Sequence, residues 1–333
     1  MSKHILIVGA GSVGKRHARN LNDLGCVVSC VDPRRDRLDE VSKEGVRLKS
    51  VFTSLEEAFA AEDTLDGVVV GSPTSFHAEQ SVAALQKGKP VLLEKPVSPD
   101  LASGLKLRSA VHDTNIPLLL GYTWRWWPPL LRAKDLIAQQ AVGQLRHIKF
   151  TMAAHLADWH PWERYQDFFM ASKTLGGGAL LDESHWLDLM LWFFGLPEKL
   201  FAKIERISDL EIETDDNVDI LVYYPNDMRV SLHLDLYARP HEKTIQFVGE
   251  KGTLIWEPNR IKIGKEMDPH WDIQEFDYDR NEMFIEVAKE FLNVLSGKSV
   301  ETCAIDDGIR VLRLIEAARL SSSQEKVIQI DTG

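Results

Sequence analysis

The first third of the chain alternates short apolar runs with helical patterns, and this alternation restricts the possible folds more than any other feature. Five apolar runs are continuous rather than alternating in hydrophobicity, which is typical of strands buried on both faces of a parallel sheet. They lie at residues 4–9, 27–32, 67–72, 91–96 and 117–122. The patterns between them predict crossover helices, with Ser54 in a capping box and Gly88 at a helix stop. We therefore expect an α/β fold with a doubly wound parallel sheet.

The pattern changes after Tyr122, where the stretch TWRWWPPLL contains two prolines and three tryptophans. The elements expected beyond it are a helix at 131–141, a strand at 145–152, a glycine-led helix ending near residue 194, several short antiparallel strands, and closing helices at 280–298 and 306–324. We place one domain boundary here, so that residues 1–122 form the first domain and residues 123–333 the second.

Composition excludes several classes of function. The 333 residues carry a formal net charge of -11, and a surface of that sign would repel the phosphates of nucleic acids and anionic membranes. The three cysteines lack the paired spacings of a zinc site or a secreted disulfide framework. No apolar run has the length of a signal-peptide core or of a membrane span. We expect a cytoplasmic protein that acts on small molecules and binds neither nucleic acid nor membrane.

The segment GAGSVG at 9–14 is a G-x-G-x-x-G motif that follows the first strand and opens the first helix. Its glycines allow a tight turn and a close approach to a pyrophosphate, which the N–H groups of the helix can bind. Asp32 ends the second strand and can accept hydrogen bonds from ribose hydroxyls, which favours NAD. Arg34 or Arg35 could neutralise a 2′-phosphate, which keeps NADP as the second choice, the alternative being that both are ordinary surface arginines. The cofactor contacts expected here are Gly9, Gly11, Ser12, Val13, Gly14, Asp32 and Arg34.

Two further motifs end later strands of the predicted sheet, at the edge where a bound dinucleotide would pass. GSPTSFH at 71–77 offers Ser72 and Pro73 as cofactor neighbours, and His77 either as a neighbour or in a structural role. GKPVLLEKP at 88–96 places Glu94 and Lys95 where nicotinamide and substrate would meet, so both are expected cofactor contacts. A lysine there can polarise a carbonyl or stabilise a developing alkoxide.

In this order, the motifs resemble the family of glucose–fructose oxidoreductase, inositol dehydrogenase and rhizopine-catabolism oxidoreductases (Gfo/Idh/MocA). The resemblance covers essentially the whole chain, through GAGSVGKRHARNL, PTSFHAEQSVAALQKGKPVLLEKPVS, GYTWRWWPPL, GGGALLDESHWLDLMLWFFG and IEAARLSSSQEKV. It implies an N-terminal Rossmann domain that binds NAD(P), and a C-terminal α+β domain with a large, mostly antiparallel sheet that often forms the interface of a homodimer or homotetramer. It also implies oxidation or reduction of sugars, cyclitols and sugar derivatives. Lys95 then matches the catalytic lysine, and the Lys95–Pro96 bond is expected to be cis.

A second group of ionisable residues follows the glycines at 176–178, in the stretch LLDESHWLD. On one continuous helix, Asp182 and Asp188 would lie about 60° to either side of His185. In family members an aspartate precedes a histidine that faces the nicotinamide by four residues, whereas Asp182 precedes His185 by three. We expect His185 to be the catalytic acid/base and Asp182 or Asp188 to orient it, the alternatives being a helix cap and an arginine partner.

The chemistry expected from these residues is hydride transfer coupled to proton transfer. Lys95 would hold the reacting oxygen while His185 takes the hydroxyl proton, and the reverse assignment, with Lys95 carrying the proton, stays open. A second enzyme class is an NAD-dependent glycosidase that oxidises its sugar transiently. A third interpretation is a dinucleotide-binding regulator without catalysis, although a regulator would need neither Lys95 nor His185.

The aromatic stretch HLADWHPWERYQDF at 155–168 is the expected substrate wall, because flat rings stack on sugars while polar groups bind hydroxyls or carboxylates. An aromatic patch against a partner subunit is the alternative. Three histidines, at 155, 160 and 185, lack the spacing of a metal site, so we expect no metal. Arg125 matches a family position near the substrate. The substrate contacts expected are Arg125, Trp159, His160, Trp162, Arg164, Tyr165 and Asp188.

Overall fold

The computed structural model describes residues 2–159, 161, 163–265 and 267–330. The chain divides into two compact units, Met1–Trp126 with Arg280–Ile309, and Trp127–Asp279 with Arg310–Gly333. The first crossing, after Trp126, lies close to the boundary expected at residue 122. The segment 280–309 returns to the first unit, however, so one boundary alone does not describe the division.

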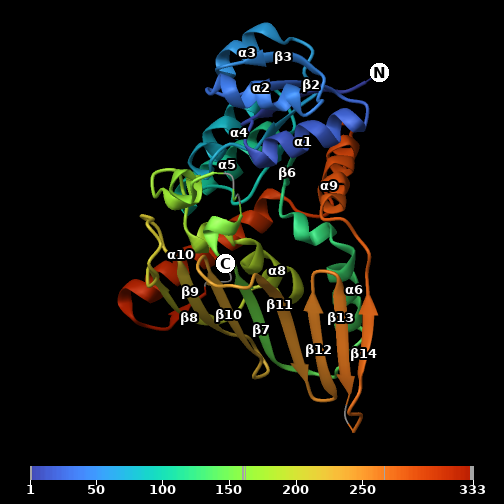
Figure 1. The fold of residues 1–333 in the computed structure, drawn as a ribbon, viewed down its shortest axis with the longest axis vertical. Helices are drawn as coiled ribbons and strands as arrows, with labels where there is room; N and C mark the ends of the chain where they lie inside the picture. Colours follow the sequence, from blue (N-terminus) through green and yellow to red (C-terminus); the bar gives the residue numbers. More distant parts are fainter. Residues whose placement is uncertain (1, 160, 162, 266, 331–333) are drawn as a thin grey trace. The chain divides into compact units, whose positions relative to one another are not determined.

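The first unit is built on a six-stranded parallel sheet with the strand order β3-β2-β1-β4-β5-β6. Figure 1 labels β2, β3 and β6 of this sheet. The strands are β1 (His4–Val8), β2 (Val27–Val31), β3 (Leu48–Phe52), β4 (Gly67–Val70), β5 (Val91–Leu93) and β6 (Leu118–Leu120). The order reverses between β1 and β4, which confirms the doubly wound sheet predicted from the sequence.

Helices follow the strands of the first unit, as the apolar patterns predict. They are α1 (Ser12–Asp23), α2 (Arg35–Lys43), α3 (Leu55–Ala61), α4 (His77–Gln86), α5 (Leu101–Thr114), the 3-10 turns η1 (Thr74–Phe76) and η2 (Thr123–Trp126), and α9 (Asn281–Val294). Ser54 caps α3, because its hydroxyl accepts a hydrogen bond from the Glu57 amide at 3.2 Å. One core cluster joins Ile7 of β1, Leu21 of α1 and Phe291 of α9, so these helices cover the same face of the sheet.

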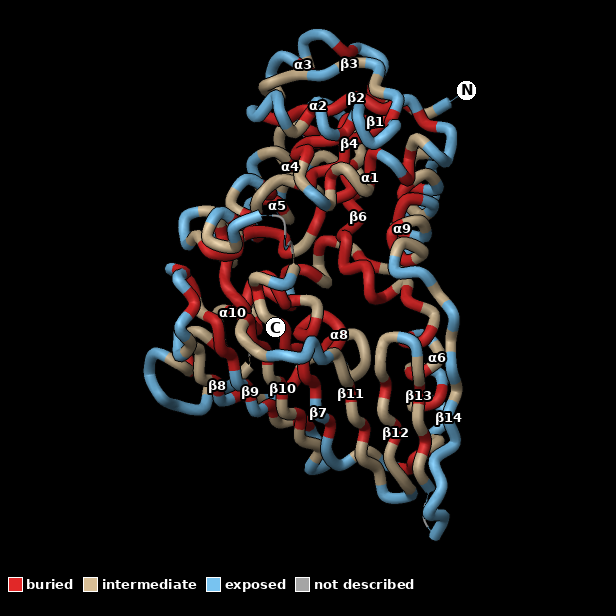
Figure 2. The backbone as a smooth tube through the Cα atoms, in the orientation of Figure 1, coloured by how far each residue is buried: buried red, intermediate tan, exposed pale blue. Residues whose placement is uncertain are grey.

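The sequence pattern predicts five of the six strands of this sheet and does not reveal β3. Its five residues LKSVF alternate between half-buried and exposed, because β3 is an edge strand with a neighbour on one side only. Figure 2 shows β1 and β4 buried along their length, whereas β3 alternates between half-buried and exposed residues. A search for continuous apolar runs therefore finds the central strands and misses this edge.

The second unit contains a nine-stranded sheet with the order β14-β13-β12-β11-β7-β10-β9-β8-β15. Its strands are β7 (Leu145–Ala153), β8 (Lys199–Glu205), β9 (Asn217–Tyr223), β10 (Arg229–Asp235), β11 (Glu242–Gly249), β12 (Gly252–Glu257), β13 (Arg260–Lys265), β14 (Trp271–Glu275) and β15 (Ile328–Gln329). Neighbours are antiparallel except β7 and β10, which run parallel. This confirms the large, mostly antiparallel sheet, to which the structure adds β8, β14 and β15.

Several helices belong to the second unit, and Trp186 of α8 anchors one of them to the sheet. The helical elements are α6 (Pro128–Ala138), η3 (Leu156–Asp158), η4 (Tyr165–Asp167), η5 (Phe169–Ala171), α7 (Ala179–Asp182) and α8 (His185–Phe194), and α10 (Ile305–Gln324) crosses into this unit. The Trp186 ring makes edge contacts with Phe150 of β7 and Trp256 of β12, at 6.3 Å between centroids in each case. All three side chains are fully buried, so α8 packs firmly on one sheet face.

A buried polar cluster lies at the amino ends of β1 and β2. Nε2 of His4 is 3.0 Å from the Ser29 hydroxyl, which donates to Glu62 at 3.2 Å. Lys49 also donates to Glu62, at 2.6 Å. Burial acts to raise the pKa of Glu62, but the Lys49 hydrogen bond and the positive charges around it lower it by more. Burial, reinforced by the Lys49 charge, lowers the pKa of His4.

We expect Glu62→Gln to destabilise the protein by about 1–3 kcal/mol at neutral pH, because buried partners lose a charged acceptor. Glu62 has a lower pKa in the folded state, so its contribution is full above about pH 4.3 and is lost as the pH falls through the folded value. The buried His4 ring also resists protonation, which costs stability below about pH 6.5.

Urea unfolding at a series of pH values checks this prediction. Because the wild-type carboxyl becomes protonated in acid, the difference between the wild type and Glu62→Gln should narrow below about pH 4. Glu56→Gln makes the same charge change at an exposed position of α3 and serves as the control. A difference that stays constant across the pH range would contradict the role assigned to Glu62.

Candidate active site

The carboxyl ends of neighbouring strands in the first unit are joined by backbone hydrogen bonds. The amide of Gly71 donates to the last residue of β1 at 2.8 Å, that of Glu94 to the last residue of β4 at 2.9 Å, and that of Gly121 to the last residue of β5 at 2.7 Å. The loops that follow β1, β4, β5 and β6 therefore begin side by side. This is the edge of a doubly wound sheet where ligands bind.

The glycine loop after β1 has the shape that a pyrophosphate needs. Gly9 has φ +93, and a Cβ there would lie 2.7 Å from the amide nitrogen of Ser72. A Cβ at Gly14 would run into the carbonyl oxygen of Gly9. At Gly11, in contrast, the nearest atom to an added Cβ is Nη1 of Arg37, at 3.4 Å. The loop thus leads to the amino end of α1, with Ser12 and Val13 in the first turn of the helix. The backbone N–H groups at this end are suited to bind the phosphates of a dinucleotide.

Arg37 is a candidate that the sequence analysis did not name. It lies in the first turn of α2, half-buried, with its guanidinium next to Gly11. A guanidinium can form two parallel hydrogen bonds to a phosphate. The motif after Asp32 indicates Arg34 and Arg35, whereas the signal for Arg37 is its place one residue before the buried Leu38 on the same helix.

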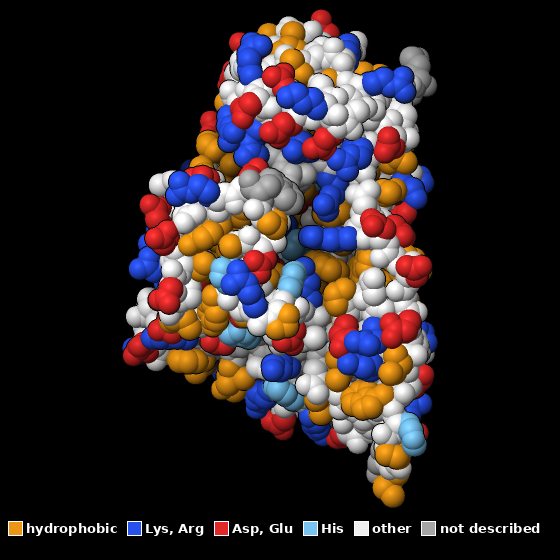
Figure 3. All heavy atoms as spheres, in the orientation of Figure 1, with side chains coloured by type: hydrophobic (Ala, Val, Ile, Leu, Met, Phe, Trp, Pro, Cys, Tyr) orange, Lys and Arg blue, Asp and Glu red, His pale blue; other side chains and the backbone are white. Residues whose placement is uncertain are grey.

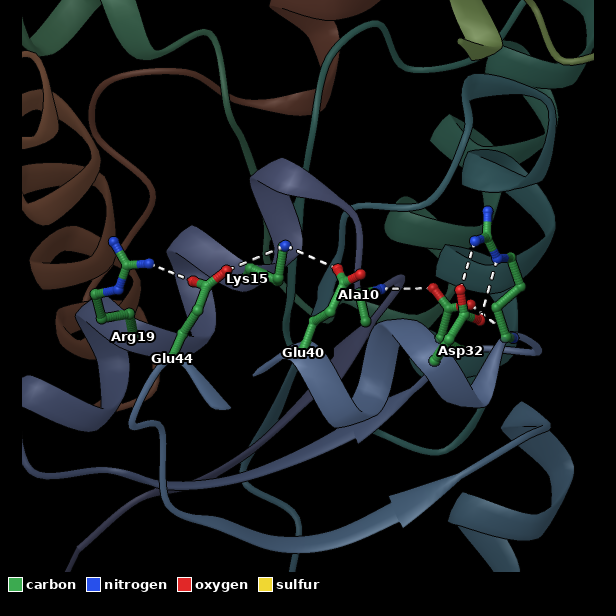
Figure 4. Close-up of polar contacts among 8 residues, drawn as sticks. Ala10, Lys15, Arg19, Asp32, Glu40 and Glu44 are labelled. Atoms are coloured by element: carbon green, nitrogen blue, oxygen red, sulfur yellow. Dashed lines mark hydrogen bonds and ion pairs between the residues drawn. The ribbon is translucent and has the colours of Figure 1, made fainter. Parts of the chain in front are cut away.

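Asp32 lies at the end of β2 with 8% of its surface exposed. One carboxylate oxygen accepts from the Ala10 amide at 2.8 Å and the other from the Arg34 amide at 2.9 Å (Figure 4). Two oxygens that accept one bond each retain lone pairs for ribose hydroxyls. The Arg34 side chain is exposed and bonds to Asp36, at 2.5 Å for its shorter contact.

Figure 4 also shows the first helix tied to the second by ion pairs. Nζ of Lys15, the residue directly after the motif, lies 3.1 Å from carboxylate oxygens of both Glu40 and Glu44, and Arg19 bonds to Glu44 as well. Lys15 therefore belongs to the packing of α1 against α2.

Glu94, the first residue after β5, is buried against α1. One of its carboxylate oxygens lies 2.7 Å from Nε2 of His17, and the Lys95 amide donates to the other at 3.4 Å. The Lys95–Pro96 bond is cis, as the resemblance implied, and Lys95 is half-buried. The Glu94 carboxylate thus bonds inside the protein, where the sequence analysis expected a cofactor contact. His17 was not identified, although it follows Gly14 by three residues on α1.

His77 lies at the start of α4 and is 1% exposed. Its Nδ1 is 2.7 Å from the carbonyl oxygen of Pro96 and its Nε2 is 2.8 Å from that of Ser72. Both ring nitrogens therefore face backbone carbonyls, which favours the structural role that the sequence left open over direct contact with a cofactor. The Ser72 hydroxyl donates to Gln80 at 2.6 Å, and Pro73 precedes η1.

The helix that carries the second group of ionisable residues is interrupted. α7 ends at Asp182 and α8 begins at His185, so the prediction of one continuous helix is wrong. In the turn between them the Trp186 amide donates to the Glu183 carbonyl, three residues back, at 3.0 Å, whereas an α-helix bonds four residues back. The buried Trp186 indole also donates to the Glu183 carboxylate at 3.1 Å, which holds this turn in place.

The interruption changes which candidates share a helix. His185 and Asp188 are three residues apart on α8, a spacing that makes side chains neighbours. Asp182 lies on α7, so the angle of about 60° derived for a continuous helix does not apply to it. Asp182 is 7% exposed, Asp188 is 1% exposed, and His185 is half-buried.

The glycines before α7 are packed against Asp215, which sequence reasoning missed. Gly178 has φ +111, and a Cβ there would lie 3.0 Å from Cγ of Asp215. One carboxylate oxygen of Asp215 accepts from the Leu180 amide at 2.8 Å. Burial raises the pKa of Asp215, and the Leu180 amide opposes this rise. Asp215 therefore fixes the start of α7.

Arg125 lies in η2 and is 5% exposed. Its Nη1 donates to the Thr302 carbonyl at 2.8 Å and lies 3.5 Å from an Asp307 carboxylate oxygen. Within the first unit these bonds tie η2 to the segment after α9. They give Arg125 a structural role, in addition to the substrate contact that the resemblance predicted.

The expected substrate wall consists largely of short 3-10 turns in the second unit. Trp159 is half-buried, Arg164 is exposed, and the Tyr165 hydroxyl accepts from the Glu211 amide at 3.3 Å. His160 and Trp162 lie outside the described residues. Beside these turns the sequence analysis missed Arg239, which forms two hydrogen bonds with Asp158 at 2.7 and 2.8 Å.

Among the described residues no group of three or more His, Cys, Asp or Glu side chains is arranged to hold a metal ion. The described helices include none with the length and hydrophobicity needed to cross a bilayer. On the face drawn in Figure 3, basic and acidic side chains are interspersed. Burial raises the pKa of Cys30 to about 12, so this thiol is unsuited to act as a nucleophile at neutral pH.

Two family models match the chain. One, described as an oxidoreductase family with an NAD-binding Rossmann fold, matches residues 3–122, and the GFO/IDH/MocA C-terminal domain matches residues 130–255. Myo-inositol 2-dehydrogenase of Thermotoga maritima is 24% identical over 98% of this chain and 98% of its own length. An uncharacterised oxidoreductase of Synechocystis is 26% identical over 68% of this chain and 63% of that protein, less than two thirds of its length.

Solved structures share the complete architecture. Levoglucosan dehydrogenase in complex with NADH and levoglucosan has a TM-score of 0.86 at 18% identity, over 100% of both chains. Myo-inositol 2-dehydrogenase of Lactobacillus plantarum has a TM-score of 0.82 at 18% identity, over 99% of this chain and 100% of that chain. At these identities the likeness establishes the fold.

Proposed function

Because the chain belongs to the Gfo/Idh/MocA family of oxidoreductases with an NAD-binding Rossmann domain, we propose that it oxidises a secondary alcohol of a sugar, sugar acid, cyclitol or nucleotide sugar, or reduces the matching ketone. The names of its relatives support this substrate class, since they include dehydrogenases of inositol and, among solved structures, of levoglucosan. These compounds share ring carbons that carry hydroxyl groups.

The placement of Lys95 carries this proposal. Lys95 follows β5 at the same sheet edge at which the glycine loop follows β1, and the Glu94 amide bonds to the end of β4 between them. In a doubly wound sheet this edge receives the dinucleotide. A half-buried lysine at that edge is suited to chemistry next to a cofactor rather than to solvation.

Three parts of the site have separate roles in the reaction. When bound, NAD supplies the hydride acceptor. The Lys95 ammonium group stabilises negative charge on the reacting oxygen, and His185 takes the hydroxyl proton, because imidazoles exchange protons near neutral pH. Asp188, its neighbour on α8, or Asp182 orients the ring.

A substrate screen tests the proposal. The protein is incubated with sugars, sugar acids, cyclitols and nucleotide sugars, each with NAD and with NADP, and reduction is followed at the nicotinamide absorbance. We expect stoichiometric NADH formation with at least one polyol. Turnover without net NADH would instead indicate transient oxidation in a glycosidase, and NAD binding without any turnover would indicate a regulator.

We also propose that NAD is preferred over NADP, and Asp32→Ala tests this preference. The Asp32 carboxylate accepts hydrogen bonds from the ribose hydroxyls and repels a 2′-phosphate. The Arg34 guanidinium, which could attract that phosphate, donates a hydrogen bond to Asp36 instead. Asp32→Ala loses these charged hydrogen bonds, which contribute about 1.5–3 kcal/mol, so its Kd for NAD should rise about 10- to 100-fold. Its affinity for NADP should be equal to or higher than that of the wild type. Arg34→Ala is the control and should change NAD affinity little; tighter NADP than NAD binding in the wild type would contradict the preference.

A further inference from the structure

A buried carboxylate and a buried imidazole form a pair directly before the proposed catalytic lysine. Oε1 of Glu94 lies 2.7 Å from Nε2 of His17, and the exposed fractions of the two side chains are 7% and 0%. A carboxylate removed from water is costly unless a partner compensates it. Since both residues belong to the first unit, α1 delivers this partner from the helix that the glycine loop opens.

The Glu94 side chain has little freedom to move. A Cβ added at Gly121, which follows β6, would lie 3.1 Å from Cδ and Oε1 of Glu94, so the backbone directly after β6 closes one side of the carboxylate. The second oxygen, Oε2, lies 3.4 Å from the Lys95 amide. The charge of Glu94 is therefore held in one place beside the Lys95 backbone.

The His17 side chain is fully buried and bonds to the Glu94 carboxylate through Nε2. Its ring makes an edge contact with Phe284 of α9 at 5.9 Å between centroids, and the Arg16 guanidinium lies over the same phenyl ring, 4.5 Å from its centroid. The second ring nitrogen, Nδ1, is buried and has no hydrogen-bond partner within the described part of the chain. Glu94 is thus the polar group for which this ring is placed.

The ionisable groups that face Glu94 are His17 from α1, His77 from α4 and Lys95 in its own segment. Burial acts to raise the pKa of Glu94, but the hydrogen bond from His17, followed by the charges of these three groups, lowers it by more. Burial lowers the pKa of His77, so that ring is a weak source of positive charge at neutral pH. The hydrogen bond from His17 is therefore the main interaction that keeps Glu94 ionised.

We propose that His17 is a positioning residue for Lys95, because its bond to Glu94 keeps a fixed, ionised carboxylate directly before the reacting lysine. The part of this role that concerns catalysis rests on the proposed function, in which Lys95 contacts the reacting oxygen. A carboxylate that lost His17 would become protonated at higher pH, and the lysine would then lose the buried negative charge next to it.

The pH dependence of activity provides the first test, on the substrate found in the screen. His17→Phe keeps the ring packing but removes the donor, and it should move the acidic limb of the kcat profile up by about one pH unit or more. His17→Gln retains an N–H donor and should restore most of the wild-type profile. His112→Phe, a matched change at a half-exposed histidine of α5, should change nothing. A profile of His17→Phe that is lower than, but parallel to, that of the wild type would overturn the proposal.

Coupling between the two residues provides the second test. Because His17 acts only through Glu94, the double variant His17→Phe with Glu94→Gln should be no slower than Glu94→Gln alone. If the two effects multiply, His17 acts by another route and the proposal fails. The Kd for NAD should change less than about threefold in all three variants, because neither His17 nor Glu94 belongs to the glycine loop at 9–14.

The third test requires no substrate and compares unfolding at several pH values. In His17→Phe the folded state should take up a proton at Glu94 that the unfolded chain, with a glutamate pKa of about 4.3, does not bind. The ratio of the folding equilibrium constant of His17→Phe to that of the wild type should therefore rise as the pH falls towards about 5. The rise should be up to about tenfold per pH unit. The double variant should lack this rise, and its presence there would contradict the assignment to Glu94. Where His17→Phe does not fold, His17→Asn, too short to reach Glu94, must show the same behaviour.

The outcomes separate the two proposals. Full activity of Lys95→Ala would disprove the role that the proposed function gives to Lys95, while the unfolding measurements would still decide whether His17 keeps Glu94 ionised. Inactive Lys95→Ala together with an unshifted acidic limb in His17→Phe would leave the proposed function intact and overturn this inference.

Discussion

Lys95→Ala is expected to lower turnover about a hundredfold or more while the Kd for NAD changes little. The reason is that Lys95 follows β5, whereas the glycine loop and Asp32, which we propose to bind the dinucleotide, follow β1 and β2. Removal of one hydrogen-bond donor that stabilises negative charge in the transition state costs about 3 kcal/mol, which corresponds to about two orders of magnitude in kcat. The effect should therefore be on kcat, as expected for an interaction made in the transition state.

Single-turnover kinetics and NAD binding by fluorescence quenching measure the two quantities separately. Lys87→Ala, at an exposed lysine just after α4, is the matched control and should retain wild-type rates. Lys95→Arg keeps the positive charge but changes its shape, and it should fall between the wild type and alanine. If Lys95→Ala kept full turnover, or lost NAD affinity as much as kcat, the role in stabilising the reacting oxygen would be excluded.

Much of the first unit could be predicted from the sequence because its physics is local. Five continuous apolar runs identify strands that are buried on both faces, and the glycines at 9 and 14 are required by backbone contacts that no other residue permits. The edge strand β3 was missed because half of its side chains face water. The return of α9 to the first unit was also missed, since its contacts, such as the paired amides of Asn20 and Asn281, join residues far apart in the sequence.

The residues that support the candidate site are those that the sequence revealed least. The partners of His17 and His77, Glu94 and Pro96, lie 77 and 19 positions away, so the motif that marked His77 did not reveal its partner, and no motif marked His17. The break between α7 and α8 arises because the buried Trp186 bonds back to Glu183, an interaction that overrides helix periodicity. Residue type and spacing thus indicated the reactive groups, while tertiary contacts determine how those groups are held.

His185→Ala is expected to lower kcat about a hundredfold or more, with NAD affinity retained, because the variant lacks the group that takes the hydroxyl proton. Its residual activity should rise with pH, as hydroxide replaces the missing base. The measurement is the pH profile of kcat for the wild type and the variant on the same substrate. A variant with the wild-type rate and profile would exclude His185 as the acid/base and favour the reverse assignment, with Lys95 as proton carrier.

Asparagine variants then show which carboxylate orients the ring. α8 places Asp188 three residues after His185, whereas Asp182 lies beyond the turn at Glu183, so we expect Asp188→Asn to cost about 10- to 100-fold in kcat and Asp182→Asn to cost less. The double variant of Asp188→Asn with His185→Ala should be no slower than His185→Ala alone, because an orienting residue acts only through the ring it orients. A larger loss in Asp182→Asn would assign the orienting role to α7 and would mean that the turn between the two helices brings Asp182 to the imidazole.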